Sequence, residues 1–338
     1  MVLCSTSKKR RMELNNAKKL TEGILLGDRA TLGRAITLAE STNAGHRKIA
    51  NEILSAIIPH AGKSRRIGIT GIPGAGKSTF IESYGSRLAG VGHKVAVLAV
   101  DPSGVLSKGS ILGDKTRMER LSSSPNAFIR PTPSGNMLGG VAAGTADAIL
   151  LCEAAGYDII LVETVGVGQS ETTVRDLTDL FVLLAISGAG DELQGIKRGI
   201  METADLVVIN KCDSGNENAA KQTAHRIKSA LHFFPAGERL WEVPVICVSS
   251  TTDHGMEHFA METDKCFEAL KQNNQLNTRR KQQDKKRFRE MINHIGLKAI
   301  LQNPKTAEFI RQSEWDIELG KQTGFGAALE FEQMISSI

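Results

Sequence analysis

Short apolar runs rich in β-branched residues recur along the middle of the chain. Most are apolar at successive positions, which is typical of strands covered by helices on both faces of a sheet. Helical stretches such as "STFIESYGSRLAGVG" separate most of these runs. This alternation predicts an α/β fold with a doubly wound, mostly parallel sheet. The predicted strands are "RRIGITG" (65–71), "KVAVLAVD" (94–101), "AFIRPT" (127–132), "YDIILVET" (157–164), "LFVLLAIS" (180–187), "LVVINK" (206–211) and "VPVICVSS" (243–250).

Helical patterns flank this region on both sides. Before it, Asp28 can cap the helix "RATLGRAITLAES". In the next helix one apolar stripe is predicted, and it contains Ile49, Ile53, Leu54, Ile57 and Ile58.

The chain after about residue 256 is helical and charged, and such an extension can fold back on the core or pair with a second chain. In "KKRFREMINHIGLKAIL" the apolar side carries Phe288, Ile292, Ile295 and Leu297. The pattern as a whole predicts an N-terminal helical extension (1–62), a central domain (63–256) and a C-terminal helical extension (257–338).

Composition narrows the class of protein. The five cysteines are scattered without a CxxC pair. This pattern fits a protein of the reducing cytoplasm and argues against both a disulfide framework and a cysteine zinc site. The absence of long apolar runs argues against a membrane span, although the basic start leaves a short organellar transit segment open. The net charge of +5 is mild. The basic run at 279–289 lacks interleaved aromatic residues, so we interpret it as a solvated helix face rather than a nucleic-acid site.

A complete P-loop, Gly71-x4-Gly76-Lys77-Ser78, follows the first predicted strand and opens a helix. Its backbone N–H groups are expected to surround phosphate oxygens, Lys77 to act as a point charge on the β- and γ-phosphates, and Ser78 to face Mg²⁺. The residues predicted to contact the nucleotide here are Gly71, Ile72, Pro73, Gly74, Ala75, Gly76, Lys77, Ser78 and Thr79.

Carboxylates near the P-loop are candidate ligands for Mg²⁺, which prefers oxygen. Asp101 and Glu163 each lie at the end of a predicted strand, and Asp114 lies in "KGSILGDKTRM". The Gly166 amide is placed to sense a γ-phosphate, because a residue without a side chain lets the backbone approach closely. We predict that Lys77, Glu163 and Gly166 serve catalysis.

The motif "NKCD" at the end of the sixth predicted strand points to guanine. The Asp213 carboxylate can accept hydrogen bonds from N1–H and the exocyclic amine of guanine, a pair of donors that adenine lacks. Asn210 can bond the guanine O6 or the loop, and the stem of Lys211 can lie over the ring. The pocket is expected to close from the other side through "VSSTT", with Ser249, Ser250 and Thr251.

In this order, "GIPGAGKSTF", "AVDPSG", "GSILGDKTRM", "ETVGVGQSE", "SGAGDELQGIK" and "NKCD" resemble the MeaB/ArgK family of G proteins. The resemblance implies a SIMIBI-like G domain and a GTPase chaperone of adenosylcobalamin-dependent acyl-CoA mutases, chiefly methylmalonyl-CoA mutase. It also implies that Asp101, Asp114 and Glu163 lie in the Mg²⁺ and switch regions.

The same resemblance implies a third switch facing the mutase, formed by "GAGDELQGIK" with Asp191, Gln194 and Lys197, and a homodimer formed by the tail. The chain departs from the family at "NKCDS", where Ala and Gly are common around the guanine motif, and at Phe288, where a tryptophan is expected. Two alternatives stay open: a GTPase metallochaperone for nickel insertion, and an ATP-dependent kinase or transport component.

Overall fold

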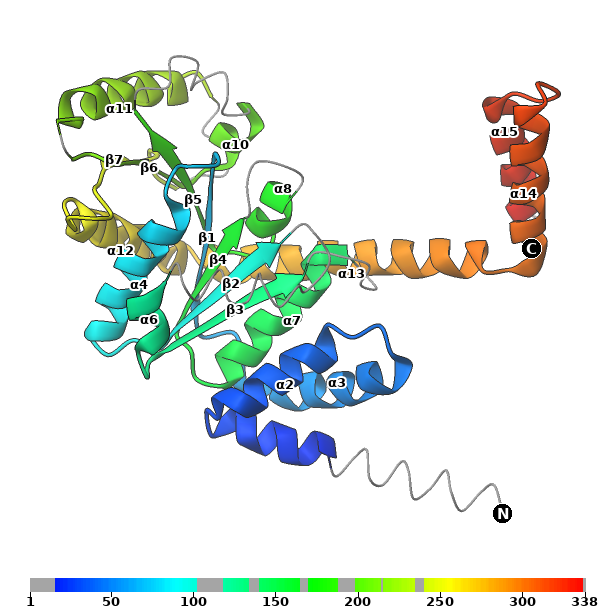
Figure 1. Ribbon diagram of the computed structural model, residues 1–338, viewed down its shortest axis with the longest axis horizontal. Helices are drawn as coiled ribbons and strands as arrows, with labels where there is room; N and C mark the ends of the chain where they lie inside the picture. The colour runs from blue at the N-terminus through cyan, green and yellow to red at the C-terminus, as the bar shows by residue number, and fades with distance from the viewer. Residues whose placement is uncertain are drawn as a thin grey trace. The chain divides into compact units, whose positions relative to one another are not determined.

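The predicted strands assemble into one parallel sheet (Figure 1). Among the residues that the structure describes, the sheet has seven strands in the order β3-β2-β4-β1-β5-β6-β7, and all neighbouring strands pair in parallel. The fold class predicted from the apolar runs is therefore confirmed. The strands are β1 (Arg65–Gly71), β2 (Val95–Asp101), β3 (Ala127–Pro133), β4 (Ile159–Thr164), β5 (Leu180–Ile186), β6 (Leu206–Asn210) and β7 (Val245–Cys247).

The computed structural model describes residues 16–101, 118–133, 140–164, 170–187, 198–213, 215–234 and 240–336. The chain folds into two compact units, Met1–Asp284 and Lys285–Ile338. The sheet and all the predicted nucleotide-binding motifs belong to the first unit.

Both faces of the sheet are covered by helices, which explains why its strands are apolar at successive positions. Strands β4 and β6 are buried at every residue. One face packs against α2 (Arg29–Ala39), α3 (Ala44–Ile57), α7 (Gly140–Ala154), α8 (Ser170–Arg175), α10 (Arg198–Thr203) and α11 (Glu217–Leu231). The other face packs against α4 (Lys77–Gly90), α6 (Glu119–Ser123) and α12 (Met256–Gln272).

The N-terminal helices join the core of the first unit. Helical backbone over 16–25 precedes α2, and Asp28 caps α2 as predicted, with its carboxylate accepting from the Thr31 amide at 2.6 Å. Helix α3 buries Ile49, Ile53 and Ile57. The prediction was wrong for Ile58, which is exposed because a 3₁₀ turn (Ile58–His60) begins there and rotates its side chain off the stripe.

The start of α13 (Gln275–Leu301) corrects the expectation of a solvated basic face. The Arg280 guanidinium is buried and donates to both oxygens of Asp179, at 2.7 and 2.6 Å. It also donates to the carbonyls of Gly62 and Ser64, both at 2.6 Å. Charge-assisted bonds to partners far away in sequence made this burial possible, and a basic run alone does not reveal them.

Replacing Arg280 with alanine should lower the free energy of unfolding by about 3–5 kcal/mol, because it leaves the fully buried Asp179 carboxylate without its cation. Urea unfolding followed by circular dichroism measures this. The matched control is Arg311→Ala, since Arg311 pairs with Glu308 on the surface and both side chains are mostly exposed. Equal stabilities of the two variants would contradict the argument.

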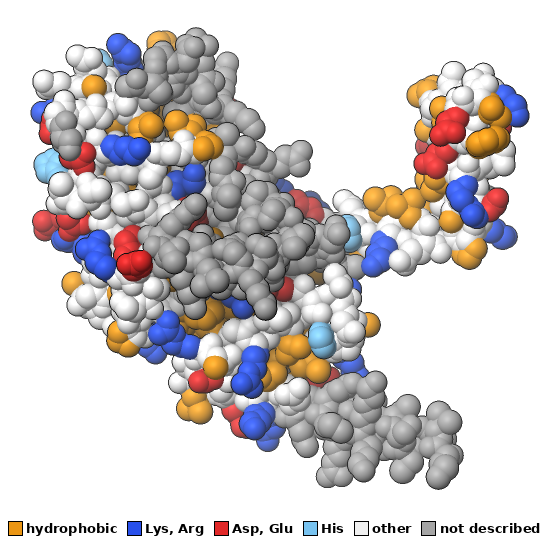
Figure 2. Space-filling model, in the orientation of Figure 1, with side chains coloured by type: hydrophobic (Ala, Val, Ile, Leu, Met, Phe, Trp, Pro, Cys, Tyr) orange, Lys and Arg blue, Asp and Glu red, His pale blue; other side chains and the backbone are white. Residues whose placement is uncertain are grey.

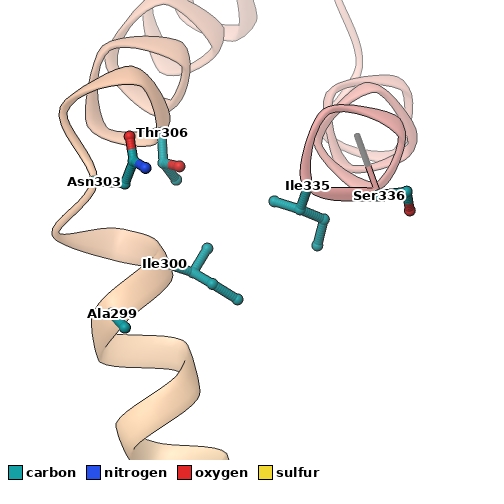
Figure 3. Close-up of a pocket in the computed structure, with 6 residues that line it drawn as sticks. All are labelled: Ala299, Ile300, Asn303, Thr306, Ile335 and Ser336. Carbon is teal, nitrogen blue, oxygen red and sulfur yellow. The ribbon is translucent and has the colours of Figure 1, made fainter. Parts of the chain in front are cut away.

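The second unit consists of the rest of α13 with α14 (Pro304–Glu318) and α15 (Gly324–Ser336). Apolar side chains lie on its surface along α13 (Figure 2), and Phe288, Ile292, Ile295 and Leu297 are all exposed. A hollow of about 440 Å³ lies within this unit, with Ile300 of α13 and Ile335 of α15 on its walls (Figure 3). None of the helices described is long and apolar enough to cross a membrane.

Candidate nucleotide-binding site

The predicted site residues whose side chains the structure describes gather where β1, β4, β6 and β7 end. In a parallel sheet all carboxyl ends meet at one edge, and this is where ligands of open α/β sheets bind. Strand β1 sits at the centre of the sheet, between β4 and β5, and leads through the P-loop into α4 (Figure 1). Motifs that are far apart in sequence are thereby brought to one place.

Glycine is required at two positions of the P-loop. Gly74 and Gly76 have φ values of 83° and 84°, in the left-handed region that side chains disfavour. A Cβ on Gly76 would also lie 2.7 Å from the Asn210 amide nitrogen. The backbone therefore turns tightly before α4, and the N-terminus of that helix faces the loop, an arrangement suited to a phosphate.

Lys77 begins α4 and is only 8% exposed. Its ammonium lies back over the loop and donates to the Gly71 carbonyl at 2.8 Å and to the Ile72 carbonyl at 3.3 Å. Burial lowers the pKa of Lys77, and the negative charges of Glu163 and Glu171 oppose that shift. A partly desolvated cation beside the loop can interact strongly with an anionic ligand.

Ser78 and Glu163, two of the residues predicted to lie at the magnesium ion, contact each other. The Ser78 hydroxyl donates to a Glu163 carboxylate oxygen at 2.9 Å, so the two oxygen donors point at one spot. Asp101 ends β2, the strand beside β4, and its side chain is outside what the structure describes. Asp114 and Gly166 lie outside the described residues, as do Asp191, Gln194 and Lys197 of the predicted third switch.

Asn210 joins the two halves of the site. Its side-chain amide donates to the Ala75 carbonyl of the P-loop at 2.9 Å, so of the two roles predicted for it the structure shows the bond to the loop. Its carbonyl oxygen accepts from the Ser250 hydroxyl at 2.7 Å. The end of β6, the P-loop and the turn after β7 are thus held in one network.

The carboxylate of Asp213 is held by hydroxyl groups. Ser249 and Thr251 both donate to the same oxygen, Oδ2, the latter at 2.7 Å. Lys211 has a φ of 61°, a left-handed conformation that turns the chain between Asn210 and Asp213. From the sequence we expected the backbone of the turn after β7 to close a pocket, and we missed that its hydroxyls orient the carboxylate.

Glu171 was also missed. It lies in the first turn of α8, is 4% exposed, and contributes negative charge at Lys77. Its place in "ETVGVGQSE", directly after the predicted phosphate-sensing loop, is the signal that could have identified it.

Comparison with known proteins gives the chain its family. The model of the family described as methylmalonyl-CoA mutase-associated GTPase MeaB matches residues 32–305. GTPase ArgK of Escherichia coli (strain K12) is 43% identical over 310 residues, which cover 91% of this chain and 94% of ArgK. The Mus musculus protein named methylmalonic aciduria type A homolog, mitochondrial, is 49% identical over 248 residues, or 70% of this chain and 60% of that protein.

A crystal structure of an LAO/AO transport system kinase superposes with a TM-score of 0.77 at 35% identity and covers 95% of this chain and 98% of that one. The family match takes in the P-loop, Glu163 and the turn after β7, which are the segments that the structure brings to one edge of the sheet. The chain accordingly belongs to the MeaB family of methylmalonyl-CoA mutase-associated GTPases.

Proposed function

We propose that this chain binds and hydrolyses GTP in order to gate cofactor loading of, or to protect, an adenosylcobalamin-dependent acyl-CoA mutase similar to methylmalonyl-CoA mutase. The observation that carries the nucleotide part is the Asp213 carboxylate, oriented by two hydroxyls and linked through Asn210 to the P-loop. The family description supports the mutase as partner.

The base pocket is assigned as follows. Asp213 accepts from N1–H and the exocyclic amine of guanine, and the stem of the exposed Lys211 lies over the ring. Asn210 holds the pocket against the P-loop, while Ser249, Ser250 and Thr251 close it. An adenine cannot offer the carboxylate the pair of donors that guanine presents, which rejects ATP strongly.

The phosphate pocket is formed by residues 71–79. Backbone N–H groups between Gly71 and Thr79, apart from Pro73, which has none, surround the phosphates. Lys77 offsets the charge that develops between the β- and γ-phosphates during hydrolysis. The Gly166 amide contacts the γ-phosphate and is released when that phosphate leaves.

A magnesium ion fits the donors at the phosphate end of the site. The Ser78 hydroxyl and a Glu163 oxygen are hard oxygen donors 2.9 Å apart, and Mg²⁺ is held by such groups together with phosphates. We assign Ser78, Asp101, Asp114 and Glu163 to it, as direct or water-mediated ligands. When bound, the ion neutralises charge on the phosphate oxygens.

The remaining assignments concern partners and place. We propose that the C-terminal helices pair with a second copy of the chain. We also propose that residues 1–62, 63–256 and 257–338 act as an N-terminal extension, a G domain and a dimerisation arm. The protein is proposed to act in the cytoplasm, or in the mitochondrial matrix of a eukaryote. The exposed apolar residues along α13 support the pairing.

Co-purification with the mutase tests the proposal against a nickel metallochaperone. That alternative needs clustered thiolate or imidazole ligands, and the described residues contain no group of three or more His, Cys, Asp or Glu that could hold a metal ion. Capture of a nickel enzyme instead of a cobalamin mutase would overturn the partner assignment while leaving GTP binding intact.

In the segment 188–199, Gln194→Ala and Lys197→Ala should each leave intrinsic GTP hydrolysis nearly unchanged but reduce its stimulation by the mutase. The reason is that this glycine- and charge-rich stretch connects β5 to α10, at the end of the sheet where the nucleotide is placed. Asp191 is expected to change partners together with them. Steady-state hydrolysis with and without purified mutase measures both effects.

The matched control for the first variant is Gln222→Ala, because Gln222 is exposed on α11. If the mutase stimulates GTP hydrolysis by both variants as fully as that of the wild type, the segment only connects β5 to α10 and is not a switch. A collapse of their intrinsic hydrolysis would place these side chains in the catalytic site itself.

A further inference from the structure

Two thiols lie side by side beneath the predicted base pocket. Cys247 is the last residue of β7 and pairs in register with Ile209 of β6. The Cys212 thiol donates to the carbonyl of that same Ile209 at 3.0 Å, and the Cys212 amide donates to the Val248 carbonyl at 2.9 Å. Cys212 therefore stands against the end of β7, next to Cys247, in the same apolar cluster.

Of the two thiols, Cys247 is the one suited to react first. The adjacent Cys212 thiol lowers the pKa of Cys247, burial opposes that shift, and the nearby charge of Lys221 lowers the pKa of Cys247 further. The adjacent Cys247 thiol and burial raise the pKa of Cys212. Cys247 is partly exposed, whereas Cys212 is buried. A thiolate that is reachable from solvent beside a buried resolving thiol is the arrangement found at redox-sensitive sites.

We propose that Cys212 and Cys247 form a reversible disulfide with hydrogen peroxide as oxidant, and that this disulfide weakens guanine-nucleotide binding. The second half of the proposal rests on the proposed GTP site. It adds to that site a modification which controls it.

The chemistry balances in two steps. The Cys247 thiolate attacks one peroxide oxygen, the O–O bond breaks and hydroxide leaves, so that Cys247 becomes a sulfenic acid. The Cys212 sulfur then attacks the sulfenic sulfur, the S–S bond forms, the S–O bond breaks, and water leaves with the Cys212 proton. The two sulfurs together lose two electrons, and the peroxide gains them.

The effect on nucleotide binding follows from where Cys212 stands. A disulfide requires the sulfurs to approach to about 2.05 Å, well inside non-bonded contact. Cys212 must then move from its place against Ile209, and its chain neighbours Lys211 and Asp213 are the residues assigned to the base. By linkage, bound GDP that fixes those neighbours should slow the oxidation.

The first experiment identifies the bond. The reduced full-length protein is treated with hydrogen peroxide, digested without reductant, and searched by mass spectrometry for a peptide that joins Cys212 to Cys247. We expect this peptide to dominate, and to form more slowly in the presence of GDP. Its absence, with Cys247 either unmodified or oxidised only to sulfinic acid, would overturn the proposal.

The second experiment measures the consequence. The affinity of the wild type for a fluorescent GDP analogue should fall at least about tenfold on oxidation, which corresponds to roughly 1.4 kcal/mol of binding free energy. Reduction with dithiothreitol should restore the affinity. Cys247→Ala should bind GDP like the wild type when reduced and be insensitive to peroxide. The matched control Cys266→Ala, which removes a buried thiol of α12, should keep the full response.

The outcomes separate this inference from the function on which it rests. If the reduced wild type does not bind GDP, the proposed function fails. If it binds GDP but peroxide leaves the affinity unchanged, or if Cys247→Ala loses affinity as the wild type does, the thiol switch is wrong and the GTP site stands.

Discussion

Lys77→Ala should reduce the rate of GTP hydrolysis by a factor on the order of 10²–10³, the typical loss when one preorganised charge-stabilising donor is removed. The ammonium is nearly buried beside the P-loop, so it acts in a poorly solvated environment where its charge counts more than in water. Single-turnover hydrolysis with saturating GTP and magnesium measures the chemical step.

The matched control is Lys63→Ala, because Lys63 is exposed just before β1, at the opposite end of that strand from the P-loop. Circular dichroism and thermal unfolding should show that both variants stay folded. Hydrolysis by Lys77→Ala at the rate of the control would mean that the P-loop is not the catalytic phosphate site.

Asp213→Asn should weaken GDP binding by roughly 3 kcal/mol, about a hundredfold, because charge-assisted hydrogen bonds to the base are lost. The variant should gain affinity for xanthosine diphosphate, whose ring presents a carbonyl where guanine has its amine. The wild type should prefer GDP to ADP by a factor on the order of 10⁴. Isothermal titration with the three nucleotides measures all of these affinities.

Asp264→Asn serves as the control, since that aspartate forms an exposed pair with Arg65. Its nucleotide preference should equal that of the wild type. Comparable affinity of the wild-type protein for ADP and GDP would refute the assignment of Asp213 to guanine.

The strands and their polar ends could be predicted from the sequence because both rest on local patterns. A strand buried on both faces has to be apolar throughout, so a polar residue at its end, such as Asn210, stands out. In a parallel sheet those ends meet, so Lys77, Glu163 and Asn210 could be assigned to one site from the sequence alone.

What the sequence could not show depends on pairing between distant segments. The bonds from Ser249 and Thr251 to Asp213 exist only because β7 lies beside β6. Arg280 belongs to a charged run that resembles a solvated face, and its burial is visible only once Asp179, 101 residues earlier, is placed beside it. Hydrogen bonds between residues so far apart in sequence produce no repeating pattern of polar and apolar residues from which they could be predicted.

The hydrogen bonds of Asn210 also determine when, during synthesis of the chain, the nucleotide site can form. The Ala75 carbonyl leaves the ribosome long before its partner, because Asn210 follows it by 135 residues and Ser250 comes another 40 residues later. A nascent chain that displays its P-loop therefore cannot complete this network until β7 and the turn after it have been made. Competence for nucleotide should thus arise in one step, late in synthesis, when contacts of long sequence separation close.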